Sequence, residues 1–180
     1  MLFTVLVISA STTLSACQSQ ATEKNMKNNS SNRYHFTSFE QQVAERMSLD
    51  IRYFCADIDG KPSVPSSKHC RAAVSKLPPE LAEMITLSGV GGIVLFAENL
   101  ASTKQIIQLT HDLQQAAMQS VSGQSLIISI DQEGGRVVRL PQATSFAGNM
   151  AIGATYLASG DKYAFDTSTV IAKELKLLGI

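Results

Sequence analysis

Charged side chains are scarce in this sequence, and neither sign predominates. They make up 17% of the 180 residues, with fifteen basic and fifteen acidic side chains. Because a nucleic-acid-binding protein needs a basic patch or stripe, we expect no nucleic-acid partner. Hydrophobic residues reach 44%, which is typical of one folded globular domain and excludes a disordered chain.

Cysteine is also rare, and the first of the three cysteines, Cys17, follows an apolar stretch of small residues at Leu2–Ser15. A stretch of this kind is typical of a processing signal. Together with Ala16-Cys17 it resembles a bacterial lipoprotein signal, although no Lys or Arg precedes the apolar run. The resemblance implies that residues 1–17 are a signal peptide and that Cys17 is acylated, which would anchor the protein in the cell envelope. An ordinary secretory signal or a short buried helix is the alternative.

Residues 18–33 are polar and rich in Asn and Ser, so we expect a flexible tether before a domain at 34–180. The resemblance and Gln18 favour a lipid anchor in the outer membrane, facing the periplasm. In that oxidising compartment Cys55 and Cys70 are a candidate disulfide. Two free thiols remain an alternative, and a metal site with His69 lacks a clear fourth ligand.

Apolar periodicity in the domain alternates between helices and strands. It predicts helices at 38–47, 79–88, 102–119 and 161–178, with strands at 51–54, 91–96 and 126–130. The stretch at 140–155 is expected to be a loop. The strand, helix and strand from Gly92 to Ile130 predict a βαβ unit with a parallel sheet.

The chemistry of the sequence gathers where the last of these strands ends. The run Leu126–Ile130 is rich in β-branched residues and is expected to be covered on both faces. It is followed by Asp131-Gln132-Glu133, Gly134-Gly135 and two arginines, Arg136 and Arg139. In parallel α/β folds, polar residues at the carboxyl end of a strand most often face the substrate.

Asp131 and Glu133 are separated by one residue, so in an extended backbone their carboxylates would lie on the same side. Such a pair could perform the acid and base chemistry of glycoside hydrolysis. Alternatively, Arg136 or Arg139 forms ion pairs with these acids and holds the loop, or binds sugar hydroxyls. The residues alone leave these interpretations open.

The segment DQEGGRVVRL, together with GGIVLFAENL one βαβ unit earlier, resembles the N-terminal domain of glycoside hydrolase family 3, in particular its bacterial β-N-acetylhexosaminidase branch. The resemblance implies an α/β fold, the N-terminal part of a (β/α)8 TIM barrel that is incomplete in this chain. It implies that Asp131 hydrogen-bonds sugar hydroxyls and that Arg139 contacts the substrate. Glu133 and Arg136 receive supporting roles, and no cofactor or metal is implied.

The resemblance places the catalytic groups downstream, as an aspartate nucleophile and a histidine acid/base. The three histidines His35, His69 and His111 all precede the motif, so we expect no catalytic residue in this chain and no activity from it alone. The predicted function of the full protein is a retaining glycosidase acting on β-linked N-acetylglucosamine or related β-sugars. A catalytically inactive glycan-binding surface lipoprotein is the alternative. No oligomeric state is predicted.

Overall fold

The computed structural model describes residues 36–55 and 72–180, all of which belong to the second of two units, Tyr34–Ile180. The first unit, Met1–Arg33, lies outside the described residues. The predictions for the signal peptide, Cys17, the tether, His35, His69 and Cys70 therefore fall on parts that are not described.

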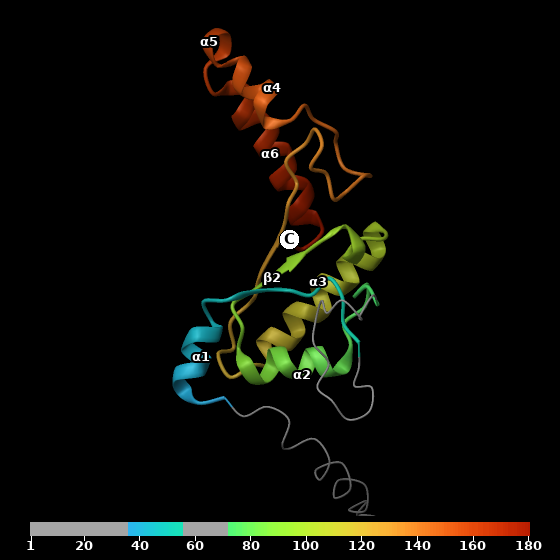
Figure 1. Cartoon of the computed structure of the whole chain (residues 1–180), viewed down its shortest axis with the longest axis vertical. Helices are drawn as coiled ribbons and strands as arrows, with labels where there is room; N and C mark the ends of the chain where they lie inside the picture. Colours follow the sequence, from blue (N-terminus) through green and yellow to red (C-terminus); the bar gives the residue numbers. More distant parts are fainter. Residues whose placement is uncertain (1–35, 56–71) are drawn as a thin grey trace, which may run out of the picture. The chain divides into compact units, whose positions relative to one another are not determined.

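Strands and helices alternate along this unit, as Figure 1 shows by colour from blue to red. The elements in chain order are α1 (Ser38–Ala44), β1 (Ser48–Asp50), α2 (Pro79–Ser88), β2 (Gly92–Leu95), the 3-10 turn η1 (Ala97–Asn99), α3 (Thr103–Met118), β3 (Ile127–Ile130), α4 (Asn149–Ala154), α5 (Tyr156–Ser159) and α6 (Lys162–Leu177).

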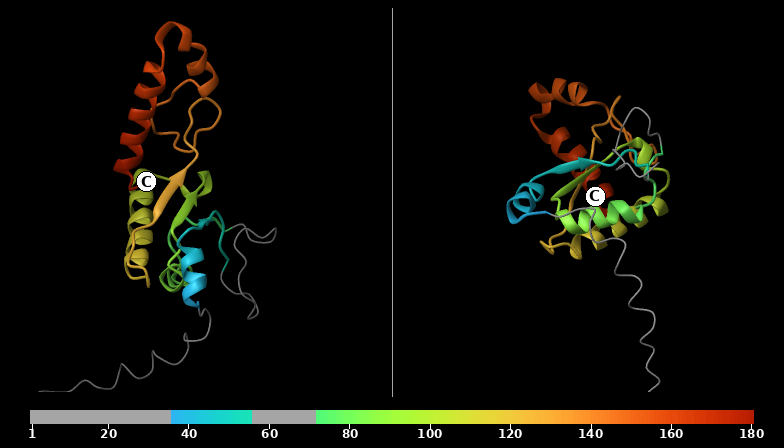
Figure 2. Two further views of the ribbon diagram at one scale, coloured as in Figure 1. Left: turned by 90° about the vertical axis from the view of Figure 1, so that its left-hand side faces the viewer. Right: turned by 60° about the horizontal axis from the view of Figure 1, so that its bottom comes forward.

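The three strands form one parallel sheet in the order β1-β2-β3. In the register, Ser48 lies opposite Gly92, and Gly92 lies opposite Ile127. The helix α2 connects β1 to β2, and α3 connects β2 to β3. The paired strands β2 and β3 lie side by side in Figure 2. This is the repeated strand and helix of the beginning of a (β/α)8 barrel, as the sequence predicts.

The core lies between one face of the sheet and the helices α2 and α3, which contact each other. Side chains alternate along a strand, so Ile93 and Leu95 of β2 point to this face and are fully buried. They pack with apolar residues at helical spacing: Leu81, Ile85, Ile106, Leu109 and Leu113. At about 25 cal/mol per Å² of apolar surface, this burial is the main stabilising term of the unit.

The helix termini follow from local sequence. Pro79 begins α2, and Gly89 ends it with φ of 65°, a left-handed conformation that favours glycine. Ser102 caps α3 by accepting a hydrogen bond from the Gln105 amide at 3.3 Å. Only half of a capping box is formed, because the Gln105 side chain accepts from the amide of Ala101 and not from that of Ser102.

A buried asparagine, Asn99, ties the exits of β1 and β2 together. It is 0% exposed, and its side-chain amide donates to the carbonyl of Val74 at 2.9 Å and to those of Ile51 and Arg52 at 3.3 and 3.4 Å. Its oxygen accepts from the Phe96 amide at 2.9 Å. Polar groups buried in this way must be paired to be tolerated, and here they are.

Several predictions about these elements were wrong. The first strand is Ser48–Asp50 and not 51–54, because a three-residue strand with one large apolar side chain is set by its pairing with β2 and has little pattern of its own. The expected loop at 140–155 contains α4 and leads into α5. Ile127 is 74% exposed, so β3 is covered on one face only. Ile107, expected on the buried face of α3, is exposed as well.

Candidate active-site edge

The loop after β3 is a tight turn that needs both of its glycines. Gly134 and Gly135 have φ of 80° and 58°, which side chains other than glycine rarely adopt. A Cβ on Gly135 would also lie 2.8 Å from Gly148. Hydrogen bonds from the Glu133 amide to the Val137 carbonyl, at 2.9 Å, and from the Val137 amide back to Gly134, at 3.1 Å, close the turn.

This turn brings Arg139 back to Asp131. The Nη2 atom of Arg139 donates to Oδ2 of Asp131 at 3.3 Å, across eight residues of sequence. Of the two arginines considered from the sequence, Arg139 therefore pairs with the strand-end acid. The Asp131 side chain is 50% exposed, so it remains accessible to a ligand, and the Arg139 side chain is 28% exposed.

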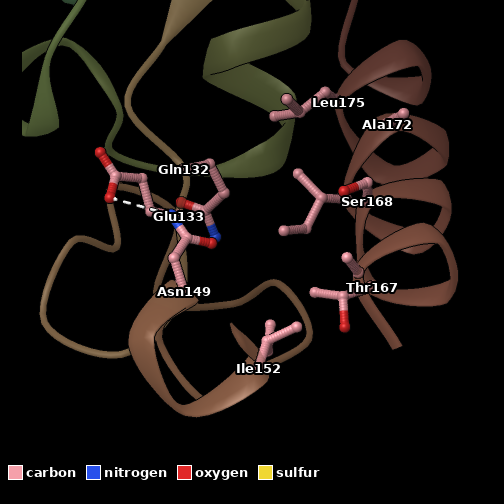
Figure 3. Close-up of a pocket in the computed structure, with 10 residues that line it drawn as sticks. Gln132, Glu133, Asn149, Ile152, Thr167, Ser168, Ala172 and Leu175 are labelled. Atoms are coloured by element: carbon pink, nitrogen blue, oxygen red, sulfur yellow. Dashed lines mark hydrogen bonds between the residues drawn. The ribbon is translucent and has the colours of Figure 1, made fainter. Parts of the chain in front are cut away.

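Glu133 has a different partner. Its Oε2 atom accepts a hydrogen bond of 3.4 Å from Asn149 at the start of α4, as the dashed line in Figure 3 shows. The two carboxylates at Asp131 and Glu133 are thus held by different groups. Arg136 is exposed and lines, with Glu133 and Met150, a surface hollow of about 620 Å³.

The ends of β1 and β2 supply charged residues that the sequence analysis did not select. The guanidinium of Arg52 lies 3.6 Å from the ring centre of Phe96, and contacts Asp50 and Glu98 at 3.8 Å. Arginine over an aromatic face is a favourable cation–π arrangement. The hydroxyl of Tyr53 donates to Glu98 at 3.1 Å.

Glu98 lies in the same electrostatic environment as the motif. The pKa of its carboxyl is held below its ordinary value of 4.5, first by a hydrogen bond from its own backbone amide. The hydrogen bond from Tyr53 and the positive charges of Arg52 and Arg139 act in the same direction, whereas desolvation opposes them. Arg139 therefore acts electrostatically on the end of β2 as well as on the end of β3.

We refer to five charged residues at the three strand ends as the strand-end cluster: Asp50, Arg52, Glu98, Asp131 and Arg139. They meet because the carboxyl ends of parallel strands share one edge of a sheet. The cluster holds three carboxylates, which accept hydrogen bonds, and two guanidinium groups, which donate them. Asp50 is the last residue of β1, so the rule that selected Asp131 would also have found it if β1 had been placed correctly, whereas Glu98 lies in η1, three residues after the end of β2.

A pocket of about 280 Å³ lies behind the motif, between the loop after β3 and the helices α4 and α6 (Figure 3). Gln132 and Glu133 line one side, and Thr167, Ser168 and Leu175 of α6 line the other. Its lining is half polar and half apolar, and Glu133 is its one charged residue.

The remaining candidate residues are distributed elsewhere. Cys55 is held in a disulfide, while Cys70 is outside the described residues, so their pairing stays a prediction. His111 is exposed on α3 beside Asp112. In the described ranges 36–55 and 72–180, no three His, Cys, Asp or Glu side chains are grouped to bind a metal ion. None of the helices in those ranges has the length and apolarity needed to span a bilayer.

A parallel sheet with helices in its crossovers, and with polar residues at the carboxyl ends of its strands, is the α/β arrangement found at the beginning of a (β/α)8 barrel. The chain matches the model of the glycosyl hydrolase family 3 N terminal domain over residues 38–180, and it belongs to that family. The family predicted from the motif is therefore confirmed.

Similar proteins agree with this assignment. Beta-hexosaminidase A of Pseudoalteromonas piscicida is 53% identical over 142 residues, which are 78% of this chain and 23% of that protein. A solved family 3 β-N-acetylglucosaminidase from Paenibacillus sp. str. FPU-7 superposes with a TM-score of 0.59 at 32% identity, covering 81% of this chain and 23% of that one. NagZ from Neisseria gonorrhoeae, solved in complex with N-trifluoroacetyl-D-glucosamine, gives 0.50 at 28% identity, covering 59% and 32%. The chain spans about a quarter to a third of the length of these proteins.

Proposed function

We propose that the protein is a glycosidase that removes β-linked N-acetylglucosamine, or a related β-sugar, from glycans by a retaining mechanism. The observation that carries the proposal is the Asp131–Arg139 ion pair at the carboxyl end of β3. Support comes from the family and from the beta-hexosaminidases that are similar over this region.

In this proposal the described residues bind and orient the sugar. Asp131 accepts hydrogen bonds from sugar hydroxyls through its exposed carboxylate, and Arg139 donates to a hydroxyl oxygen from its fixed fork of N–H groups. Their mutual ion pair holds both side chains in place before the substrate arrives, which lowers the entropy lost on binding. In retaining glycosidases one group attacks the sugar and forms a covalent glycosyl-enzyme intermediate while a second group protonates the leaving oxygen. The second group then acts as the base for the water that hydrolyses the intermediate. We assign those reacting groups to residues outside this chain.

The test replaces Asp131 with Asn in the full-length protein and follows hydrolysis of an aryl β-N-acetylglucosaminide. We expect kcat/KM to fall about a hundredfold or more, because a site built to hydrogen-bond a hydroxyl loses its charged acceptor. Arg139→Lys should also lower kcat/KM, since the ammonium cannot reproduce the planar fork.

The matched control is Asp166→Asn, which removes a similarly exposed carboxylate from its ion pair with Lys162 on α6. It should leave kcat/KM unchanged. Equal activity of Asp131→Asn and the unmutated protein would refute the binding role of Asp131. A protein with no hydrolase activity that still binds the sugar would favour a glycan-binding lipoprotein instead.

We further propose that Cys17 carries a lipid anchor that holds the protein at the bacterial outer membrane, facing the periplasm. An acyl chain contributes about 0.8 kcal/mol of membrane affinity per buried methylene. Cys17→Ser should therefore move the protein from the detergent-extracted membrane fraction to the soluble fraction without changing kcat/KM. Identical partition of the two proteins would rule out the anchor.

A further inference from the structure

Gln132, between the two acids of the motif, is bonded to the backbone on the far side of the loop. Its Oε1 atom accepts from the amide of Arg139 at 2.9 Å and from the amide of Leu140 at 3.2 Å. Both hydrogen bonds are made through the same oxygen. They close the base of the loop, whereas the bonds of Val137 with Glu133 and Gly134 close only its tip.

The far side of the loop is anchored as well as closed. Leu140 is fully buried and belongs to the hydrophobic core. Gln132 directly follows Asp131, and Arg139 directly precedes Leu140. The side chain of Gln132 therefore fixes the distance between the backbones that carry Asp131 and Arg139.

Arg139 depends on this backbone support because its side chain has few partners. Within the described part of the chain its guanidinium makes one hydrogen bond, of 3.3 Å to Asp131, and its buried Nε atom has no hydrogen-bond partner. This one bond is at the long end of hydrogen-bond distances, so it depends on the separation of the backbones that carry Asp131 and Arg139. A shift of the loop base would therefore carry the guanidinium away from Asp131.

We propose that Gln132 is a positioning residue that sets Arg139 for sugar binding. The inference rests on the proposed function, which assigns Arg139 to the sugar, and adds a residue that touches Arg139 and not the ligand. Both of these hydrogen bonds are accepted by the side-chain oxygen of Gln132. The carboxylate of glutamate has the same shape and can accept them, whereas the thioether of methionine has a similar size and cannot.

The chain offers a matched control at the other end of the same strand. The side chain of Gln114, on α3, accepts from the Leu126 amide and donates to the Leu126 carbonyl, both at 2.9 Å. Gln114 thus also binds backbone through two hydrogen bonds, but at the amino end of β3. Replacing it removes a comparable structural tie without touching the strand-end cluster.

The experiment compares Gln132→Met, Gln132→Glu and Gln114→Met in the full-length protein. For an aryl β-N-acetylglucosaminide we expect Gln132→Met to lower kcat/KM about tenfold to a hundredfold, mainly through KM, as a misplaced binding group does. Gln132→Glu should restore KM to within about threefold of the unmutated value, since both acceptor bonds are kept. Gln114→Met should lower the melting temperature and leave KM unchanged.

A second measurement does not depend on activity. Amide hydrogen exchange, followed by NMR in the 180-residue chain, should be slow at Arg139 and Leu140 in the unmutated protein and in Gln132→Glu. It should be fast at both amides in Gln132→Met. If Gln132→Met does not fold, Gln132→Asn, which withdraws the oxygen by one methylene, replaces it in both measurements.

The two measurements separate the possible failures. If the unmutated protein hydrolyses no glycoside, the proposed function fails, and amide exchange still tests the two hydrogen bonds. If the protein is active and Gln132→Met changes neither KM nor exchange, the positioning role is overturned. It is also overturned if Gln132→Glu fails to restore KM, or if Gln114→Met raises KM equally.

Discussion

The two ends of the parallel sheet are held by different kinds of contact. At the amino ends of the strands, backbone touches backbone: the amides of Gly91 and Gly92 donate to the carbonyls of Ala44 and Met47, both at 3.0 Å. At the carboxyl ends, charged side chains of the strand-end cluster meet and remain partly exposed. The amino end is therefore constrained by close packing, and the carboxyl end by the chemistry of its side chains.

The glutamines Gln114 and Gln132 lie at opposite ends of β3 and make this contrast testable. Each binds backbone groups through two hydrogen bonds. At the amino end the tie holds the start of a strand, and its loss should affect stability alone. At the carboxyl end the tie holds a residue that we assign to the ligand, so its loss should affect binding.

The largest effect on stability is expected from Gly91→Ala at the amino end. A Cβ atom there would lie 1.9 Å from the carbonyl oxygen of Glu45, and backbone cannot yield as a side chain can. We expect the free energy of unfolding, measured by urea titration, to fall by about 3 kcal/mol.

Gly153→Ala in α4 is the control for this substitution, because a Cβ atom there meets nothing within 4 Å. It should be neutral or stabilise the protein by up to about 1 kcal/mol, the usual gain from glycine to alanine in a helix. Equal stability of Gly91→Ala and Gly153→Ala would break the proposed contrast between the two ends.

A smaller effect is expected at the carboxyl end from Glu98→Gln. The pKa of Glu98 is lowered in the folded protein, so its ionised form contributes stability at pH values above about 4.5, its ordinary value, and this contribution is lost as the pH falls through the folded pKa. The side chain is 38% exposed, and we expect a difference below about 1 kcal/mol at pH 7.

Thermal unfolding of the two proteins at pH 7 and at pH 3 checks this. The stability difference should shrink at the lower pH, because protonation of Glu98 removes the charge that distinguishes it from glutamine. A difference that is constant with pH, or larger in acid, would show that Glu98 acts through its shape and not through its charge.

Strong periodicity made much of the fold predictable from the sequence. The helices α2, α3 and α6 and the strands β2 and β3 each carry apolar residues at a clear spacing, and each was predicted to within a few residues. The strand β1 was misplaced because Ser48–Asp50 is defined by its partner Gly92–Val94. The helix α4 was missed because its residues, Asn149–Ala154, are mostly small and include a glycine.

The candidate site was predictable where it is local. Asp131 and Arg139 belong to one turn, and the glycines between them indicate that the chain reverses. The contact of Arg52 with Glu98 joins residues 46 positions apart and depends on the register of β1 against β2. Sequence patterns carry no information on such a contact until the strands are placed.

The buried side chain of Asn99 joins segments of the unit that are far apart in sequence. One amide group binds the carbonyls of Ile51, Arg52 and Val74, so the stretch after β1, the stretch before α2 and the turn η1 that carries Asn99 are held together at one point. None of these stretches can open without leaving a buried polar group unpaired in the others. We therefore expect the residues around the exits of β1 and β2 to open together in local unfolding and not one stretch at a time.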